Sequence, residues 1–291
     1  MNLARRGLSA LRSMVGSFGR RGSEPPIAQL SEAALVELRS GPGAAPEPLA
    51  SALEAIAAGA VTTEEQAWLD RIERLRAELL SSTETVWFKT RKSEVPVRDI
   101  CRDASVSTEW GRFLFRLVRE TRPSTCLELG TSLGLSASYQ AAALDLNGKG
   151  RLLTVEVSEP LSRLASANLQ RLGASRAEVR LGGFQEVLGS LLSEIAPVDV
   201  AFIDGNHLED RTIEYFEQIA PCASEGALLI FDDISWSEGM ARAWATIQSS
   251  DKVVSSVDLG RLGICVIAGE ASSRGGDRTK HLVKAQTPEN Q

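Results

Sequence analysis

The feature that most constrains how this chain folds is an alternation of short apolar runs with longer amphipathic stretches between residues 125 and 268. Strands that alternate with helices form a parallel sheet whose two faces are both covered. The last two runs are joined only by a short turn around Gly260, which predicts an antiparallel hairpin. We therefore expect an α/β fold with a doubly wound, mostly parallel sheet of seven strands. The predicted strands are Thr125 to Leu129, Arg151 to Val155, Ala177 to Leu181, Val198 to Ile203, Ala227 to Phe231, Val253 to Val257 and Gly263 to Ala268.

The region before this sheet, residues 25–95, reads as helices interrupted by glycine and proline. One predicted helix follows Ser31 and a second crosses Pro48 to Ala58. A third begins at Thr63, where Gln66 is expected to close a capping box. We expect this helical region to carry specificity or subunit contacts.

The main domain begins near a strongly apolar helix, predicted from Glu109 to Glu120 with Ser107 or Thr108 as its cap. The residues beyond Glu270 are polar and are expected to be disordered. These patterns divide the chain into four parts. They are a basic extension at 1–24, the helical region at 25–95, the main domain at 96–270 and a disordered tail at 271–291.

The N-terminal extension combines positive charge with an apolar stripe. Residues 1–22 hold five arginines and no acidic residue, and Leu8, Leu11, Val15 and Phe18 recur at helical spacing. Such a helix could make weak contact with an anionic membrane surface. The alternative is a frayed terminal extension, because Gly7, Gly16 and Gly19 each cost about 1 kcal/mol relative to alanine in a helix.

The composition excludes several classes of partner. With 32 Lys plus Arg against 38 Asp plus Glu, the chain has a formal net charge of -6 and is no general attractor for nucleic acid. The 4 cysteines form no Cys-x-x-Cys pair, which disfavours a disulfide framework or a zinc site. No apolar run reaches the roughly 18 residues that span a bilayer. We expect a cytoplasmic protein with small-molecule partners.

A glycine-containing loop follows the first predicted strand and leads directly into a helix. The loop reads LELGTSLG over residues 127–134, so its glycines have the spacing Gly-x-x-x-Gly. Glycines let the backbone approach a ligand, and a helix N-terminus offers free N–H groups. The spacing differs from the Gly-x-Gly-x-x-Gly of dinucleotide binders, which favours a nucleotide-like ligand without a pyrophosphate. Glu156 ends the second strand, where an acid can accept hydrogen bonds from both ribose hydroxyls.

Carboxylates follow two further strands of the predicted sheet. Asp204 ends the fourth strand, and Asp232 and Asp233 end the fifth. Both ends point to the same edge of a parallel sheet, above which ligands bind. Three converging carboxylates repel one another unless a cation neutralises them, and oxygen ligands favour Mg, Ca or Mn. The alternative is that one aspartate caps a helix while another faces water.

His207 lies three residues after Asp204, at the mouth of the predicted site. Histidine is the side chain best suited to accept a proton near pH 7, so we consider it as a general base. The alternative is a structural imidazole that hydrogen-bonds a loop carbonyl.

At these residues, from about Glu109 to Ala268, the sequence resembles the metal-dependent, catechol O-methyltransferase-like branch of the class I S-adenosylmethionine methyltransferases. The resemblance implies a Rossmann-like methyltransferase fold with S-adenosylmethionine as cofactor and a divalent metal, with Mg²⁺ expected. It places Ser136 near the methionine carboxylate and Gln185 beside the adenine. The candidate cofactor-binding residues are Glu128, Gly130, Ser132, Gly134, Ser136, Glu156, Gly183, Gln185 and Asp204; the candidate metal ligands are Asp204, Asp232 and Asp233; and the candidate catalytic residues are His207 and Asp204.

Two departures bear on the substrate. The catechol enzymes have lysine at the position of His207 and asparagine at that of Asp233. Asp-x-x-His followed by an acidic pair is more similar to bacterial sugar-tailoring O-methyltransferases, in which the histidine is the base. The resemblance implies O-methylation of a small-molecule hydroxyl, on a sugar or a glycosylated natural product. The alternatives are a metal-independent methyltransferase and a catalytically silent scaffold with the cofactor-binding fold.

We also expect self-association into a homo-oligomer, because the helical region supplies more apolar faces than a thin layer of helices covers alone. The residues behind this expectation are Leu35, Leu38, Leu53, Ile56, Leu69, Ile72 and Leu75.

Overall fold

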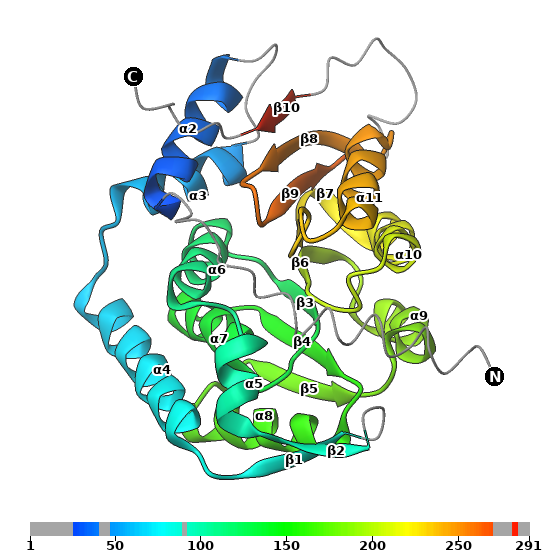
Figure 1. Ribbon diagram of the computed structural model, residues 1–291. Coiled ribbons are helices and arrows are strands. Elements are labelled where there is room, and N and C mark those ends of the chain that lie inside the picture. The colour runs from blue at the N-terminus through cyan, green and yellow to red at the C-terminus, as the bar shows by residue number, and fades with distance from the viewer. Residues whose placement is uncertain (1–25, 41–46, 89–91, 270–280, 285–291) are drawn as a thin grey trace, which may run out of the picture.

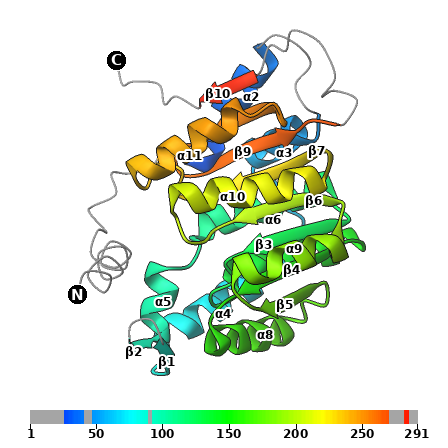
Figure 2. The ribbon, with the colours of Figure 1, turned by 90° about the vertical axis from the view of Figure 1, so that its right-hand side faces the viewer.

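A central twisted sheet covered by helices on both faces dominates the computed structural model (Figures 1 and 2). The structure describes residues 26–40, 47–88, 92–269 and 281–284. The predicted basic extension at 1–24 lies outside the described residues, and so does most of the predicted tail. None of the described helices combines the length and the apolarity needed to cross a membrane.

The sheet has the doubly wound topology that the sequence predicts. Its strand order is β10-β8-β9-β7-β6-β3-β4-β5. The strands from β3 to β7 pair in parallel, whereas β9 is antiparallel to both β7 and β8. The strands are β3 (Thr125–Leu129), β4 (Arg151–Glu156), β5 (Ala177–Leu181), β6 (Val198–Ile203), β7 (Ala223–Phe231), β8 (Val253–Asp258), β9 (Gly263–Ile267) and β10 (His281–Lys284).

The seven predicted strands and the C-terminal hairpin are confirmed, with boundaries that shift by a few residues. The prediction of disorder throughout 271–291 is wrong at His281–Lys284, which pair in parallel with β8 as β10. The strand has four residues, and its two apolar residues are adjacent, so it gives no periodic signal within the polar tail.

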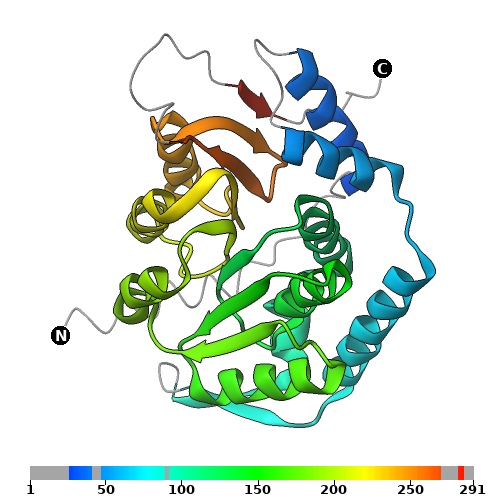
Figure 3. The same ribbon diagram turned by 180° about the vertical axis from the view of Figure 1, so that it is seen from behind.

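Two apolar cores follow from the pleat of the sheet, because successive side chains of a strand point to opposite faces. In β7, Leu228 and Ile230 join the core on one face, and Leu229 and Phe231 join the core on the other. Figure 3 shows the sheet from the side opposite to Figure 1. The second face is covered by α9 (Phe184–Ile195), α10 (Glu209–Ile219) and α11 (Glu238–Ser249), and the first by α6 (Thr108–Thr121), α7 (Leu135–Asn147) and α8 (Glu159–Leu172).

The helical region before the sheet contains α2 (Ile27–Ser40), α3 (Glu47–Ala58) and α4 (Thr63–Ser81). Helix α2 begins before Ser31, so the predicted start is wrong. The capping box of α4 is formed by Thr62 and Glu65, not by Gln66, because the cap lies one residue earlier than predicted. A hairpin of β1 (Thr85–Phe88) and β2 (Ser93–Pro96) follows, and then α5 (Val97–Asp103). These three elements were not predicted from the sequence.

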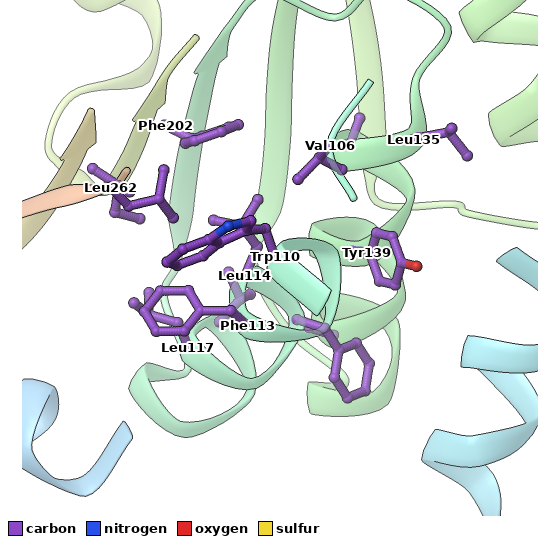
Figure 4. Packing of buried hydrophobic residues seen from close by; sticks show 14 of the residues in the cluster. Val106, Trp110, Phe113, Leu114, Leu117, Leu135, Tyr139, Phe202 and Leu262 are labelled. Carbon is purple, nitrogen blue, oxygen red and sulfur yellow. The ribbon is translucent and has the colours of Figure 1, made fainter. Parts of the chain in front are cut away.

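Helix α6 confirms the predicted apolar helix and places its aromatic residues in the first core. Ser107 caps the helix by accepting a hydrogen bond from the backbone N–H of Trp110. Figure 4 shows Trp110 between Phe202 of the sheet and Phe113, whose ring it meets edge to face at a centroid distance of 5.4 Å. This core also buries the residues on which the prediction of self-association was based, with Ile56 partly buried against it.

Candidate functional site

The site lies where the winding of the sheet reverses. From β3 the chain continues to β4 and β5 on one side, whereas β6 and β7 add to the other side. Ligands of doubly wound sheets bind at the carboxyl ends of the strands beside this switch point. The carboxyl end of β3 continues into the glycine loop, and that of β6 into Asp204.

The backbone geometry explains why both loop positions are glycine. Gly130 has a φ of +110°, and a Cβ there would lie 2.0 Å from the carbonyl oxygen of Asp204. Gly134 has a φ of +81° and caps α7, so the free N–H groups of that helix begin directly at the loop. The spacing Gly-x-x-x-Gly therefore brings a helix N-terminus to the switch point.

A pocket with about 210 Å³ of empty space opens at this place. Its walls are the glycine loop, the first turn of α7, Asp204 and residues 104–106, which connect α5 to α6. The hydroxyl oxygen of Ser105 is shielded from solvent and has no hydrogen-bond partner in the part of the chain that the structure describes. Buried polar groups are normally hydrogen-bonded, so a ligand in the pocket could supply the hydrogen-bond partner that Ser105 lacks. Sequence reasoning missed residues 104–106, because a short link between helices carries no motif.

Glu156 connects the second strand to the glycine loop. Its carboxylate accepts hydrogen bonds of 2.8 Å from the backbone N–H groups of Ser132 and Ser158. Burial raises the pKa of Glu156, while these backbone hydrogen bonds lower it and only partly offset the effect of burial. The acid predicted to bind a ribose thus lies beside the loop predicted to bind the same ligand.

Glu128 lies beneath the loop, whereas Ser136 on the first turn of α7 lines the pocket. The Glu128 side chain is fully buried, accepts a hydrogen bond of 2.9 Å from Gln140, and is also bonded to Thr154 and Ser136. Burial raises the pKa of Glu128 to about 7, and these hydrogen bonds limit the rise. This network stiffens the loop from below.

The residues predicted beside the adenine lie at the start of α9. Gly183 caps that helix, and Gln185 is exposed on its first turn. With its amide oxygen turned toward α10, Gln185 accepts two hydrogen bonds of 3.0 Å from Arg211.

Unusual backbone conformations gather at this edge of the sheet. Six non-glycine residues have a positive φ in the described part of the chain. Four of them, Ser132, Asn206, His207 and Asp233, follow β3, β6 and β7 at their carboxyl ends. Such conformations cost on the order of 1 to 3 kcal/mol each and cluster at functional sites.

A positively charged side chain, that of Arg261, lies within the predicted cluster of aspartates. The guanidinium of Arg261 donates two hydrogen bonds of 2.7 Å to the two carboxylate oxygens of Asp232 and lies 3.5 Å from Asp233. Burial opposes ionisation of Asp232, but the hydrogen bonds and charge of Arg261 hold its pKa below the ordinary value. The pKa of Asp204 is raised well above its usual range, by burial and then by repulsion from Asp232 and Asp233.

This arrangement does not fit a divalent metal as it stands. Within the described ranges, no three His, Cys, Asp or Glu side chains gather in a way that could hold a metal ion. Both oxygens of Asp232 are already bonded to Arg261. Sequence reasoning missed Arg261 because the residue belongs to no motif. The predicted hairpin could have pointed to Arg261, because the register of β9 with β7 and β8 places the hairpin turn beside the carboxyl end of β7.

His207 lies beside Asp204, with its Nε2 atom 3.5 Å from the Asp204 carboxylate. Both side chains are largely buried. Asn206, between them in sequence, donates a hydrogen bond of 2.5 Å to the hydroxyl of Tyr215 and so ties the loop to α10. The two predicted catalytic residues are therefore brought together.

The fold and the site are similar to those of methyltransferase domains. Residues 127–234 match the family model described as a methyltransferase domain. This part of the chain is also similar in sequence to proteins named catechol O-methyltransferase.

Two catechol O-methyltransferases show how far the sequence similarity extends. A catechol O-methyltransferase of Niastella koreensis is 34% identical over 132 residues, which cover 45% of this chain and 58% of that protein. The catechol O-methyltransferase of Bos taurus is 29% identical over 143 residues, 45% of this chain and 51% of that protein. The chain therefore spans about half the length of these relatives.

Solved structures show the same fold. An O-methyltransferase from Bacillus cereus, in complex with SAH, has a TM-score of 0.52 at 23% identity and covers 69% of this chain and 90% of its own. The O-methyltransferase TomG from Streptomyces achromogenes, in complex with SAM, has a TM-score of 0.50 at 21% identity and covers 72% of this chain and 92% of its own.

Proposed function

We propose that this chain is an S-adenosylmethionine-dependent O-methyltransferase that acts on a hydroxyl group of a small molecule. The observation that carries the proposal is the hydrogen bond from the backbone N–H of Ser132 to the Glu156 carboxylate. This bond joins the acid expected to bind a ribose to the glycine loop, which lines an open pocket. The relatives named catechol O-methyltransferase and the neighbouring O-methyltransferases with bound SAM or SAH support the same activity.

The residues present fit the cofactor. Gly130 lines the pocket without a side chain, and Ser105 presents a buried hydroxyl that has no partner among the described residues. Glu156 would hold the ribose, and the start of α7 would face the polar methionine end. When bound, S-adenosylmethionine supplies a methyl group attached to a sulfonium sulfur, and the neutral thioether that remains is a good leaving group.

His207 and Asp204 would handle the proton of the acceptor. Bound S-adenosylmethionine would supply the methyl carbon to the acceptor oxygen, and the electron pair of the carbon–sulfur bond would stay with the sulfur. The hydroxyl proton passes to Nε2 of His207, which faces the Asp204 carboxyl at 3.5 Å. The pocket walls hold the two reactants close together, which lowers the entropic part of the barrier.

For the acceptor we propose a sugar or a glycosylated natural product. The support is His207 at the position where the catechol enzymes have lysine, since an aliphatic hydroxyl is a weak acid and needs a base. The divalent metal predicted from the three aspartates is the less favoured part of the prediction, because Arg261 already neutralises Asp232. No step proposed here passes through a metal ion.

Calorimetry with S-adenosylhomocysteine, in the presence of a chelator, tests the cofactor site. Glu156→Ala should weaken binding by about 1.5 to 3 kcal/mol, the usual worth of hydrogen bonds to a charged group. Glu159→Ala is the matched control, because this exposed acid pairs only with Arg163 among the contacts seen in the described residues. Unchanged affinity in a folded Glu156→Ala variant would place the ribose elsewhere.

A further inference from the structure

A buried guanidinium stands at the centre of the carboxylate cluster. The side chain of Arg261 is 13% exposed and that of Asp232 is 2% exposed. Their contact is a two-point fork, with Nε and Nη2 each 2.7 Å from one carboxylate oxygen. Planar, bidentate pairs of this kind are the strongest of the charge-assisted hydrogen bonds.

The backbone holds Arg261 in this place. The residue belongs to the turn between β8 and β9, where Gly260 has a φ of +83° and donates its N–H to the Asp258 carboxylate at 2.8 Å. The carbonyl of Arg261 accepts a hydrogen bond of 3.0 Å from the N–H of Ile234, just after the acidic pair. The hairpin turn is thus fastened to the loop that carries Asp232 and Asp233.

A divalent cation would have to compete with this guanidinium. Hard cations such as Mg²⁺ bind carboxylate oxygens directly, and both Asp232 oxygens already accept hydrogen bonds from Arg261. A metal ion next to Arg261 would bring two like charges together in a poorly solvated place. If Arg261 moved away instead, its charge would lose a buried partner.

We infer that Arg261 is the resident cation of this site and neutralises the carboxylates that a divalent metal would otherwise bind, so that the chain binds S-adenosylmethionine and transfers methyl groups without a metal ion. The part that concerns methyl transfer rests on the proposed function. Arg261 acts through Asp232 and Asp233, so it is a positioning residue.

Binding of Mn²⁺, followed by electron paramagnetic resonance on metal-stripped protein, tests this directly. Wild-type protein should show no site with a Kd below about 1 mM, the weak end of oxygen-ligand sites. Arg261→Gln should bind one Mn²⁺ at least about tenfold more tightly, because the freed carboxylates become ligands. Arg242→Gln is the matched control, since Arg242 makes a comparable fork to Glu209 on the exposed side of α10 and α11.

Tight Mn²⁺ binding by the wild-type protein would overturn the inference, and so would a folded Arg261→Gln variant that gains no site. If Arg261→Gln is unfolded without metal, about 1 mM Mn²⁺ should restore its circular dichroism signal, and a failure to do so also counts against the inference. Calorimetry with S-adenosylhomocysteine on the same samples separates the two claims. A wild-type chain that binds neither Mn²⁺ nor S-adenosylhomocysteine contradicts the proposed function and leaves Arg261 as the resident cation.

Discussion

The carboxyl group of Glu128 is the most thoroughly buried ionisable group under the glycine loop, and its pKa is raised to about 7 by that burial. A carboxyl whose pKa is raised on folding binds its proton more tightly in the folded chain than in the unfolded one. Its contribution to stability is therefore complete below about pH 4.5 and is lost as the pH rises through about 7. Near neutral pH this residue works against the stability of the loop that it supports.

Glu128→Gln removes this titration and keeps the shape of the side chain. Relative to the wild type, the variant should gain about 2.5 kcal/mol in unfolding free energy between pH 5 and pH 8, which follows from a pKa that rises from 4.5 to about 7 on folding. Urea unfolding at both pH values measures the difference. A constant difference between the two proteins would show that Glu128 stays in one protonation state across this range.

The proposed role of His207 can be tested separately from cofactor binding. His207→Ala should reduce turnover of the true acceptor by a factor of about 10² to 10⁴, the usual contribution of a general base. Affinity for S-adenosylhomocysteine should stay nearly unchanged. A variant that keeps more than about a third of the wild-type turnover would make the imidazole structural.

Single residues were predictable from the sequence where a strand end fixed their position. Glu156, Asp204 and Asp232 follow strands with clear apolar runs, so their place at one edge of the sheet was foreseeable. Arg261 was not, because its position depends on the register of an antiparallel hairpin. Register is set by cross-strand packing that a single sequence does not display.

At the scale of elements, the helical region before the sheet is part of the core and not a separate layer. Glu65 on α4 pairs with Arg116 and Arg119 on α6, and Tyr139 on α7 donates a hydrogen bond to Glu73 on α4. Figure 1 shows α4 along the outside of the helices that cover the first face of the sheet. The proposed cofactor helix α7 is therefore supported by a residue from the N-terminal region.

Leu53→Ala on α3 tests how far this region belongs to the core. Leu53 is fully buried, so the cavity left by the substitution should lower the unfolding free energy by about 2 to 5 kcal/mol. Leu80→Ala on α4 is the control, because Leu80 is 43% exposed and should cost about 0.5 kcal/mol or less. Equal small losses in both variants would mean that α3 does not pack on the core in solution.

Elements with strong periodicity were predicted well, and short ones were not. The apolar runs of β3 to β7 are long enough to identify, whereas β1 and β2 have four residues each with no regular alternation. The capping box of α4 was placed one residue too late, because Thr62 and Thr63 are both good caps and only the backbone geometry separates them.

At the scale of the whole molecule, self-association stays a prediction, and the burial of the apolar residues on which it was based weakens its support. The apolar faces of α2, α3 and α4 pack mainly within the chain. Sedimentation at micromolar concentration tests the prediction, and a monomer would contradict it. A monomer would also remove the need for subunit contacts in the helical region.

Deletion of residues 1–22 should leave soluble methyltransferase activity intact, because the first residues of a domain rarely determine its folding. These residues lie outside the described ranges. Turnover and thermal unfolding of the shortened protein, compared with the full chain, are the measurements. A loss of folding would show that the basic extension is structural.

The most direct test of the proposed activity is transfer of an isotope-labelled methyl group from S-adenosylmethionine. The acceptors are a panel of sugars, phenols and glycosylated natural products, with the full chain in the presence of a chelator. We expect the label on an oxygen atom of one acceptor class, with turnover that His207→Ala strongly reduces. Absence of transfer to every acceptor, together with absence of S-adenosylhomocysteine binding, would contradict the proposed function and favour a scaffold with a methyltransferase fold.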